Sequence, residues 1–331
     1  KSRSFWSGGL KLKVEFYVAF ASFIITAVLG ILLIPVLDKL KFGQRVRSDG
    51  PKRHLMKMGT PTMGGIIFIP AIALATLIFA DISNDTVAVV FFIIGFGLIG
   101  FADDFIKITK KRSLGLRANQ KLLFQLLLSV ALIIYVFAFL ENPTEINTPL
   151  HQSRLDLGTF YIPFTVFLIL GTVNSVNLTD GLDGLVSGIV AIIGFFYTVL
   201  LSKSNFNLAV FSSAMTGGCL GFLLFNRYPA RVFMGDTGSL GLGGALAALT
   251  VLSRSHIFLA ITGIIFIIET LSVILQVLYF RLTGKRIFKM SPIHHHFELS
   301  GWSEVKVVRT FWLITLLAGI LSFIIYKETF F

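Results

Sequence analysis

Five carboxylates stand where apolar segments of this sequence end, and they are the residues best suited to chemistry: Asp103, Asp104, Asp180, Asp183 and Asp236. A carboxylate at the end of a membrane span is costly and is a functional candidate by default. Aspartate oxygens and the amide oxygens of Asn177 and Asn226 are hard ligands that suit Mg²⁺. Lys57, Lys121 and Arg227 add phosphate-binding charge. The combination predicts transfer of a phosphate-bearing group, with Mg²⁺ neutralising charge between the attacking and leaving oxygens.

Three of these acids also have a purely structural interpretation. Asp236 is followed by Thr237 and Ser239 and can be the N-cap of a helix. Asp180 and Asp183 are three residues apart, so they share a face if the segment is helical, or they occupy a turn with the neighbouring glycines. Such roles explain single residues, but five acids at the ends of apolar segments are more than capping requires.

Asp103 and Asp104 are adjacent, which limits what they can do together. They either form a polar end to an apolar helix or serve the reaction. Because adjacent residues on a helix point about 100° apart, we expect that the pair does not hold one ion jointly. One of them would take part in the reaction, and the other would face a basic residue such as Lys121.

Segment 289–298 contains three consecutive histidines: His294, His295 and His296. Consecutive residues of a helix cannot all face one ion, so a zinc site is disfavoured. Ser291 and Pro292 are typical of an N-cap followed by proline at the first helical position. This pattern places His294 near a helix N-terminus, where backbone donors and the helix dipole favour an anion. A surface turn with incidental histidines is the alternative.

One further acid lies inside an apolar segment. Glu269 falls near the middle of segment 256–280, and Gln276 follows seven residues later on the same helix face. Polar side chains within a membrane span usually face protein or a water-filled groove. We expect this for both residues, and for Glu269 we favour a structural bond between helices.

The composition shows what must position these residues. Of 331 residues, 55% are hydrophobic, only 14% are charged, and 34 are phenylalanine. Soluble domains carry about 25% charged residues, so this chain is a polytopic membrane protein and not a soluble enzyme or a disordered scaffold. The single Cys219 excludes an internal disulfide and a cysteine metal cluster. In a membrane protein the net charge of +12 reports orientation and anionic lipid, so we expect no nucleic-acid partner.

Apolar segments long enough to cross a bilayer predict an all-α fold of about ten transmembrane helices: 14–36, 62–80, 86–102, 121–140, 160–176, 184–201, 207–225, 239–252, 256–280 and 308–326. The eighth is short and glycine-rich, which predicts close packing against its neighbours. The ninth runs on through Arg281 and is expected to project past the membrane. No repeat or long linker divides the chain, so 1–331 is predicted to be a single integral membrane domain. Residues 1–13 are expected to be an N-terminal extension that is partly an expression remnant.

The distribution of basic residues predicts the orientation. The loops after the odd-numbered spans hold 20 lysines and arginines, against eight on the opposite face. Cytoplasmic loops carry an excess of these residues. The odd-numbered loops, which also contain the five aspartates, are therefore expected in the cytoplasm, and both termini on the extracytoplasmic side.

Five motifs, in order along the chain, carry a resemblance to a known family: GTPTMGG (59–65), GFADDF (100–105), NLTDGLDG (177–184), FMGDTGS (233–239) and PIHHHFE (292–298). Over nearly its whole length the sequence resembles the phospho-N-acetylmuramoyl-pentapeptide transferases. These bacterial enzymes belong to the polyprenyl-phosphate N-acetylhexosamine-1-phosphate transferase superfamily, which shares the aspartates. The PIHHHFE motif favours the muramoyl-pentapeptide branch over the N-acetylglucosamine-1-phosphate enzymes.

The resemblance implies a reaction in a cleft at the cytoplasmic face of the bacterial inner membrane. Undecaprenyl phosphate would attack UDP-N-acetylmuramoyl-pentapeptide, giving lipid I and UMP with Mg²⁺ required. This step belongs to peptidoglycan biosynthesis, and with it to cell wall biogenesis, cell shape, the cell cycle and cell division. Family members are commonly homodimers, so a homodimer is expected.

The resemblance also assigns roles to residues. Asp236 would bind the metal, and Asp103 would be the base or proton acceptor for the lipid phosphate. The expected catalytic set is Asp103, Asp104, Asp236, His294 and Lys121. The expected substrate-binding set, in which Phe233 stacks on the uracil ring, is Lys57, Thr62, Asn177, Asp180, Asp183, Asn226, Phe233, Gln276, His295 and His296. A lipid phosphate is already ionised near neutral pH, so an electrostatic or positioning role fits Asp103 equally well. A two-step route through an aspartyl-phosphate stays open.

A transporter or lipid flippase is the alternative from another class, since many carriers have ten spans and intramembrane polar groups. It predicts polar residues at mid-membrane on several spans and a two-fold repeat. Here the acids gather at one face, and no internal symmetry is evident. A purely structural membrane scaffold has no use for five such aspartates. The sequence therefore favours the transferase.

Overall fold

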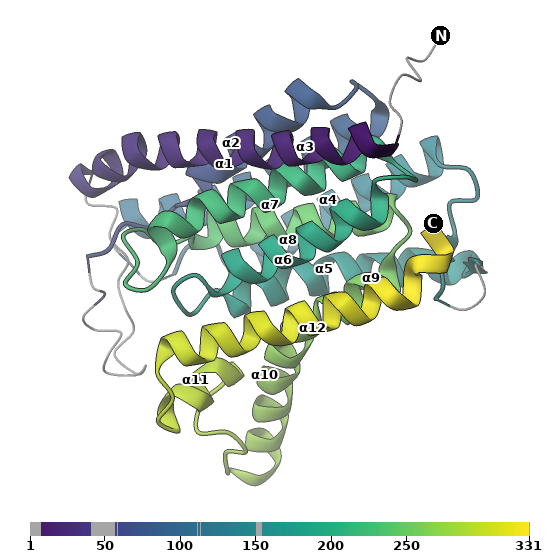
Figure 1. Cartoon of the computed structure of the whole chain (residues 1–331). Helices are drawn as coiled ribbons and strands as arrows, with labels where there is room; N and C mark the ends of the chain where they lie inside the picture. The colour runs from purple at the N-terminus through teal and green to yellow at the C-terminus, as the bar shows by residue number, and fades with distance from the viewer. Residues whose placement is uncertain are drawn as a thin grey trace.

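The structure is a computed structural model that describes residues 8–40, 57, 59–110, 112, 114–149 and 154–330, with side chains from Val14 to Tyr326. The described residues form long helices and one short ribbon (Figure 1). The first six helices are α1 (Gly8–Lys39), α2 (Gly65–Phe79), α3 (Asn84–Thr109), α4 (Ala118–Phe139), α5 (Tyr161–Thr179) and α6 (Leu185–Leu201). The remaining helices are α7 (Phe206–Asn226), α8 (Gly235–Leu252), α9 (His256–Thr262), α10 (Ile264–Thr283), α11 (Ile293–Leu299) and α12 (Glu304–Phe330).

The ribbon joins α4 to α5. Strand β1 (Glu145–Asn147) pairs antiparallel with β2 (Arg154–Asp156), with Ile146 opposite Leu155. A 3₁₀ turn, η2 (Gly158–Phe160), leads from the ribbon into α5. The ribbon was not expected, but three-residue strands are too short to leave a periodic signal. The predicted all-α class is confirmed, because each described segment that could span a membrane is helical.

Seven helices within the described residues are long and apolar enough to cross a bilayer: α1, α3, α4, α5 with its preceding turn, α7, α10 and α12. Two others, α2 and α6, are apolar but shorter, at 15 and 17 residues. The protein is therefore an all-α polytopic membrane protein. Each segment expected to span the membrane coincides with a helix or, for 256–280, with two.

Two boundaries differ from expectation. Helix α1 begins at Gly8, inside the expected 1–13 extension, and residues 1–7 lie outside the described residues. The expected ninth span is broken at Gly263 into α9 and α10, because glycine is a poor residue for a helix interior. After the break α10 turns away from the bundle and, with α11, forms the projection at the bottom of Figure 1. Because α10 leaves the bundle sideways and is itself long and apolar enough to cross a bilayer, its projection past the membrane stays a prediction.

Helix α8 occupies the interior, and each of its residues from Thr237 to Leu252 is buried. Its glycines explain how: a side chain on Gly243 would meet the backbone of Val173 in α5, and one on Gly244 would overlap Phe96 in α3. Helix α3 also packs closely on α8 through a glycine, since a Cβ at Gly100 of α3 would overlap the Asp236 carbonyl. Small residues of this kind let membrane helices approach closely. The predicted close packing of the eighth segment is confirmed.

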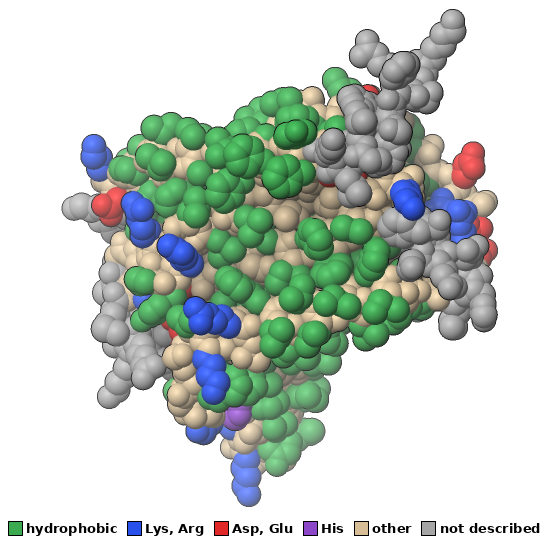
Figure 2. Space-filling view, viewed as in Figure 1, with side chains coloured by type: hydrophobic (Ala, Val, Ile, Leu, Met, Phe, Trp, Pro, Cys, Tyr) green, Lys and Arg blue, Asp and Glu red, His purple; other side chains and the backbone are tan. Residues whose placement is uncertain are grey.

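The bundle has an apolar body and polar ends. The start of α1 and the end of α12 lie at the same end of the bundle (Figure 1). In Figure 2, hydrophobic side chains cover the middle of the visible face, while lysines and arginines gather at the opposite end, near α11 and the start of α12. The end of α3, the loop between α5 and α6 and the start of α8 carry the aspartates considered next.

Candidate functional site

Three carboxylates converge where α3 ends and α8 begins. Asp103 and Asp104 lie in the last turns of α3, each only 3% exposed, and Asp236 lies in the first turn of α8. One oxygen from each carboxylate lies within 4.8 Å of the others. The close packing of α3 on α8 at Gly100 brings Asp236 to Asp103 and Asp104, although it follows them by more than 130 positions.

Backbone geometry fixes this carboxylate cluster. Gly235, at φ +70°, starts α8, and a Cβ there would lie 2.6 Å from Asp104 Oδ2. The backbone N–H and the hydroxyl of Thr237 donate to the same oxygen at 2.9 and 2.8 Å. Asp236 is thus the second residue of α8, not its N-cap, so capping as its sole role was a wrong alternative. Asp104 instead anchors the first turn of α8.

Two lysines hold the carboxylates together. Lys107 Nζ lies 2.6 Å from Asp103 Oδ2, 3.0 Å from Asp236 Oδ2 and 3.6 Å from Asp104 Oδ1. Lys121 Nζ, from α4, lies 2.9 Å from Asp236 Oδ2 and 3.2 Å from Asn177 Oδ1. Both side chains are partly exposed, so their charge is available at the rim of the cluster.

The geometry of the adjacent acids differs from the expected one in two respects, although whether they hold one ion jointly stays a prediction. Asp103 and Asp104 do offer oxygens to one shared position, because Lys107, at i+4 and i+3, lies on the helix surface between their two directions. The basic partner of the pair is Lys107, whereas Lys121 binds Asp236.

Asn177, near the end of α5, completes the cluster. Its amide donates to Asp236 Oδ1 at 3.0 Å and to Ser239 Oγ at 2.8 Å. Asp103 is held from the other side by the Leu116 N–H, which donates to Oδ1 at 2.8 Å. Each acid is therefore oriented by at least one neutral donor, which leaves other carboxylate oxygens for a cation.

The donor set fits Mg²⁺. Three carboxylates and nearby amide oxygens are hard ligands of the kind that Mg²⁺ takes, together with water and substrate phosphate. The Lys107 ammonium is a cation in contact with all three acids, which shows that their oxygens are arranged to surround positive charge. Asp103, Asp104 and Asp236 would hold the metal ion.

The loop 180–184, between α5 and α6, links this cluster to two further groups of side chains. The second group surrounds Asp183 and Lys57, and the third surrounds His294 and Glu269. Removal from solvent and the negative charges of Asp236, Asp104 and Asp183 raise the pKa of the Asp180 carboxyl to about 8. Gly181 packs so closely on His294 that a Cβ would overlap the Nε2 atom. The turn interpretation of this segment is confirmed, and Gly181 permits the close approach of α11.

Asp183 belongs to the second group. Its carboxylate accepts from Lys57 Nζ at 2.7 Å and from the Ala230 N–H at 2.9 Å. Lys57 also lies 2.6 Å from Glu304 at the start of α12, and the same Glu304 oxygen accepts from the Asp183 N–H at 2.7 Å. Partial burial lowers the pKa of Lys57, but the charges of Glu304 and Asp183 outweigh burial and raise it above its ordinary value. Lys57 is thus a fixed cation between two acids.

Three more of the expected substrate-binding residues surround this group. Asn226 accepts from the Gly184 N–H and the Ser187 hydroxyl and donates to the Val232 carbonyl, so it braces the start of α6. The half-buried Phe233 exchanges backbone hydrogen bonds with Pro61 and Gly64. Thr62 is buried on the same segment, next to Gly235.

The third group comes from α10 and α11. His294 is buried, and its Nδ1 lies 3.0 Å from Glu269 Oε1. The expectation that Glu269 and Gln276 face protein is confirmed, because both are buried. Gln276 accepts from the Ile287 and Phe288 N–H groups and donates to the Phe288 carbonyl. It therefore fixes the loop before α11.

The histidines differ in their surroundings. His295 Nδ1 lies 2.9 Å from Glu298, and His296 Nδ1 accepts from the Lys289 N–H at 3.1 Å. Helix α11 begins at Ile293, with Pro292 as its cap residue, so the expected cap at Ser291 was one residue too early. His294 does lie in the first turn, but its close partners are Glu269 and Gly181.

Three contributing residues were missed in the sequence. Lys107 could have been found from its spacing to Asp103, because acid and base at i, i+4 face each other on a helix. Thr237 was considered only beside a cap, although it binds Asp104. Glu304 carries no local signal, since its partner Asp183 is 121 positions away.

Comparison with known proteins agrees with this arrangement. The family model described as glycosyl transferase family 4 matches residues 86–254, which contain the whole carboxylate cluster. The chain therefore belongs to glycosyl transferase family 4.

Curated relatives show to which enzymes of this family the chain is most similar in sequence. A phospho-N-acetylmuramoyl-pentapeptide-transferase of Thermoanaerobacter sp. (strain X514) is 55% identical over 91% of this chain and 95% of the relative. Proteins of the same name from Desulfitobacterium hafniense and Clostridioides difficile are 50% and 49% identical over 94% and 93% of the chain, and over 97% and 96% of their own lengths. Within the transferase family, the chain thus belongs with the phospho-N-acetylmuramoyl-pentapeptide-transferases.

Proposed function

We propose that this protein transfers phospho-N-acetylmuramoyl-pentapeptide from UDP-N-acetylmuramoyl-pentapeptide to undecaprenyl phosphate, giving lipid I and UMP with Mg²⁺ required. The carboxylate cluster carries the proposal, because three acids and two lysines meet at one end of a membrane bundle. One substrate is a lipid that stays in the bilayer and the other a polar nucleotide that stays out of it. A site at the end of α3 and the start of α8 is accessible to both substrates.

The reacting groups are anionic, and the chain supplies charge and position for them. Lys107 and Lys121, partly exposed at the rim of the cluster, bind phosphate oxygens. Asp104 keeps the first turn of α8 on α3 through Thr237, and so fixes Asp236. Asp103 faces the lipid phosphate as proton acceptor or orienting group. Mg²⁺, when bound by Asp103, Asp104 and Asp236, would stabilise the charge that develops on the diphosphate.

The nucleotide end belongs to the groups on either side of loop 180–184. Asp183, Asn226 and Phe233 are proposed to hold the uridine, with Phe233 stacking on the base. Lys57 and Thr62 line the same region from segment 57–65, held there by the Lys57 ion pairs. Asn177, Asp180, Gln276 and the histidines of α11 are proposed to contact the phosphates and the muramoyl portion, directly or through the loops that they fix.

The proposed location is the bacterial inner membrane, with ten spans and the cluster on the cytoplasmic side. The short α2 and α6 and the buried α8 are counted as spans because neighbouring helices shelter them. The excess of basic residues at the cluster end supports this orientation. We propose a homodimer as the assembled form.

Release of UMP tests the proposal. Detergent-solubilised protein, undecaprenyl phosphate and UDP-N-acetylmuramoyl-pentapeptide should release UMP with Mg²⁺ and none with EDTA. UDP-N-acetylglucosamine should not replace the donor. Absence of UMP with the muramoyl donor, or equal turnover with both donors, would contradict the assignment.

A further inference from the structure

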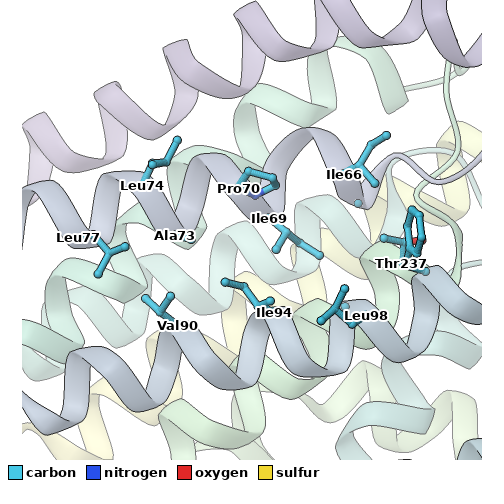
Figure 3. A pocket seen from close by; sticks show the side chains of 13 residues that line it. Ile66, Ile69, Pro70, Ala73, Leu74, Leu77, Val90, Ile94, Leu98 and Thr237 are labelled. Carbon is cyan, nitrogen blue, oxygen red and sulfur yellow. The ribbon is translucent and has the colours of Figure 1, made fainter.

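An apolar groove lies between α2 and α3, and Figure 3 shows Ile69 and Leu98 among the side chains that line it. A side chain on either Gly65 or Gly100 would overlap the backbone at the start of α8. These tight contacts close the space between the groove and the carboxylate cluster. A charged residue without a role in the proposed reaction lies elsewhere, at the start of α12.

This residue is Glu304, which holds two groups of the nucleotide end through one oxygen. Its Oε1 lies 2.6 Å from Lys57 Nζ and accepts from the Asp183 N–H at 2.7 Å. Each partner is more than 120 positions away in the sequence. The Glu304 side chain is only 10% exposed, so its carboxylate is largely withdrawn from water. Glu304 therefore joins Lys57 and loop 180–184 to the first turn of α12.

The Lys57 ammonium is shared between two acids. It lies 2.7 Å from Asp183 Oδ1 and 2.6 Å from Glu304 Oε1, so neither acid holds it alone. Asp183 uses its other oxygen for the Ala230 N–H. An ionised carboxylate has about four acceptor positions, so Asp183 keeps lone pairs for a further donor. If Glu304 were neutral, the ammonium would close on Asp183, and the two charges would satisfy each other.

The edge of a uracil ring carries an N–H between two carbonyls, and it is recognised by an acceptor with a donor beside it. Asp183 and Lys57 form such a pair, provided that they are not satisfied by each other. We infer that Glu304 is a positioning residue for nucleotide recognition, which shares the Lys57 ammonium and so keeps both groups available to the base. The inference rests on the proposed function, in which Asp183 holds the uridine.

Two simpler roles for Glu304 can be separated from this one. An acid in the first turn stabilises any helix through the helix dipole, and an acceptor for the Asp183 N–H braces the loop. Glu304→Gln keeps an acceptor oxygen for that N–H but loses the charge that attracts Lys57. Asp85→Asn is the matched control for the helix role, because Asp85 lies in the first turn of α3, at the far end from the carboxylate cluster.

The first experiment compares UMP with CMP, whose base presents an acceptor where uracil has its N–H. Both dissociation constants are measured on the detergent-solubilised full chain, CMP by competition with UMP. Glu304→Gln should weaken UMP binding about tenfold, the scale of one hydrogen bond to a charged group, and leave CMP binding nearly unchanged. Asp85→Asn should change neither. Parent-like UMP affinity in Glu304→Gln, or equal losses for UMP and CMP, would overturn the inference.

The second experiment follows turnover and a conservative variant. In Glu304→Gln, KM for the UDP donor should rise with the UMP dissociation constant, while kcat and the thermal unfolding midpoint change little. Glu304→Asp keeps the charge and should retain more of the preference for UMP than Glu304→Gln. The reverse order, or a fall in kcat at unchanged KM, would overturn the inference. A parent protein that shows this preference but releases no UMP from the muramoyl donor would instead refute the proposed reaction and leave Glu304 its role in a uridine nucleotide site.

Discussion

Asp236 is the residue on which the site most depends, because it meets both lysines and the Asn177 amide. Asp236→Asn keeps the size of the side chain but removes its charge. We expect turnover to fall roughly 100-fold or more, the scale seen when a group that stabilises a charged transition state is removed. The thermal unfolding midpoint should change little. UMP release and a thermal-shift assay measure the two effects, and near-normal turnover would refute the metal role.

A second prediction at the residue scale concerns Lys107. Its ammonium contacts all three carboxylates that would hold the metal, so we expect it to compete with Mg²⁺ in addition to its proposed binding of phosphate. Lys107→Met should lower kcat by roughly tenfold or more and lower the Mg²⁺ concentration needed for half-maximal rate. Lys121→Met is the control, because Lys121 contacts only Asp236 among the three acids. If Lys107→Met needs more Mg²⁺ than the parent, the competition is disproved.

Phe233 tests the nucleotide end separately. Phe233→Ala removes the proposed stacking surface but leaves the backbone hydrogen bonds to Pro61 and Gly64 possible. We expect UMP binding to weaken by about tenfold, in line with one to three kcal/mol per stacked base, with a smaller effect on kcat. Unchanged UMP affinity in calorimetry would rule out stacking.

The sequence identified most members of the site but not their contacts. Aspartates at the ends of apolar segments are recognisable because burial of charge is costly there. Which cation each acid meets depends on helix packing, so Lys107 rather than Lys121 pairs with Asp103. The pairing of Asp183 with Glu304 joins loop 180–184 to α12, and nothing local to either residue predicts it.

At the scale of elements, the contact between α3 and α8 sets the distance between the acids. A Cβ on Gly100 would overlap the Asp236 carbonyl, whereas one on Gly95 would meet only the Leu128 side chain at 3.2 Å. Gly100→Ala should therefore cost about 1–3 kcal/mol of stability and most of the activity. Gly95→Ala, the same change on the same helix, should be neutral or stabilising because alanine favours helix. Thermal unfolding and UMP release of the two variants give the comparison. If the two variants had equal stability and equal activity, the contact between α3 and α8 would not determine the positions of the acids.

Helix positions were predictable because each apolar segment is long and bounded by polar residues. The break at Gly263 and the ribbon β1–β2 were not, since a single glycine and three-residue strands leave weak signals. The direction of α10 away from the bundle follows from that break, and it determines where the histidines of α11 meet loop 180–184.

At the scale of the whole molecule, the proposed orientation can be measured at the two ends of α3. The single Cys219 is buried, so a Cys219→Ser background removes reaction at the native cysteine. Ile82→Cys and Lys110→Cys then place thiols at exposed positions before and after the helix. In intact cells a membrane-impermeant maleimide should label the first and not the second. The reverse pattern would place the carboxylate cluster outside the cell.

The central claim is that acids from α3 and α8 hold one divalent cation at the membrane surface. Electron paramagnetic resonance of Mn²⁺ titrated into the purified protein with UMP tests it most directly. We predict one bound Mn²⁺ per chain in the parent and in Asp183→Asn, and loss of that ion in Asp236→Asn. Retention of the ion in Asp236→Asn, or its loss in Asp183→Asn alone, would contradict the account.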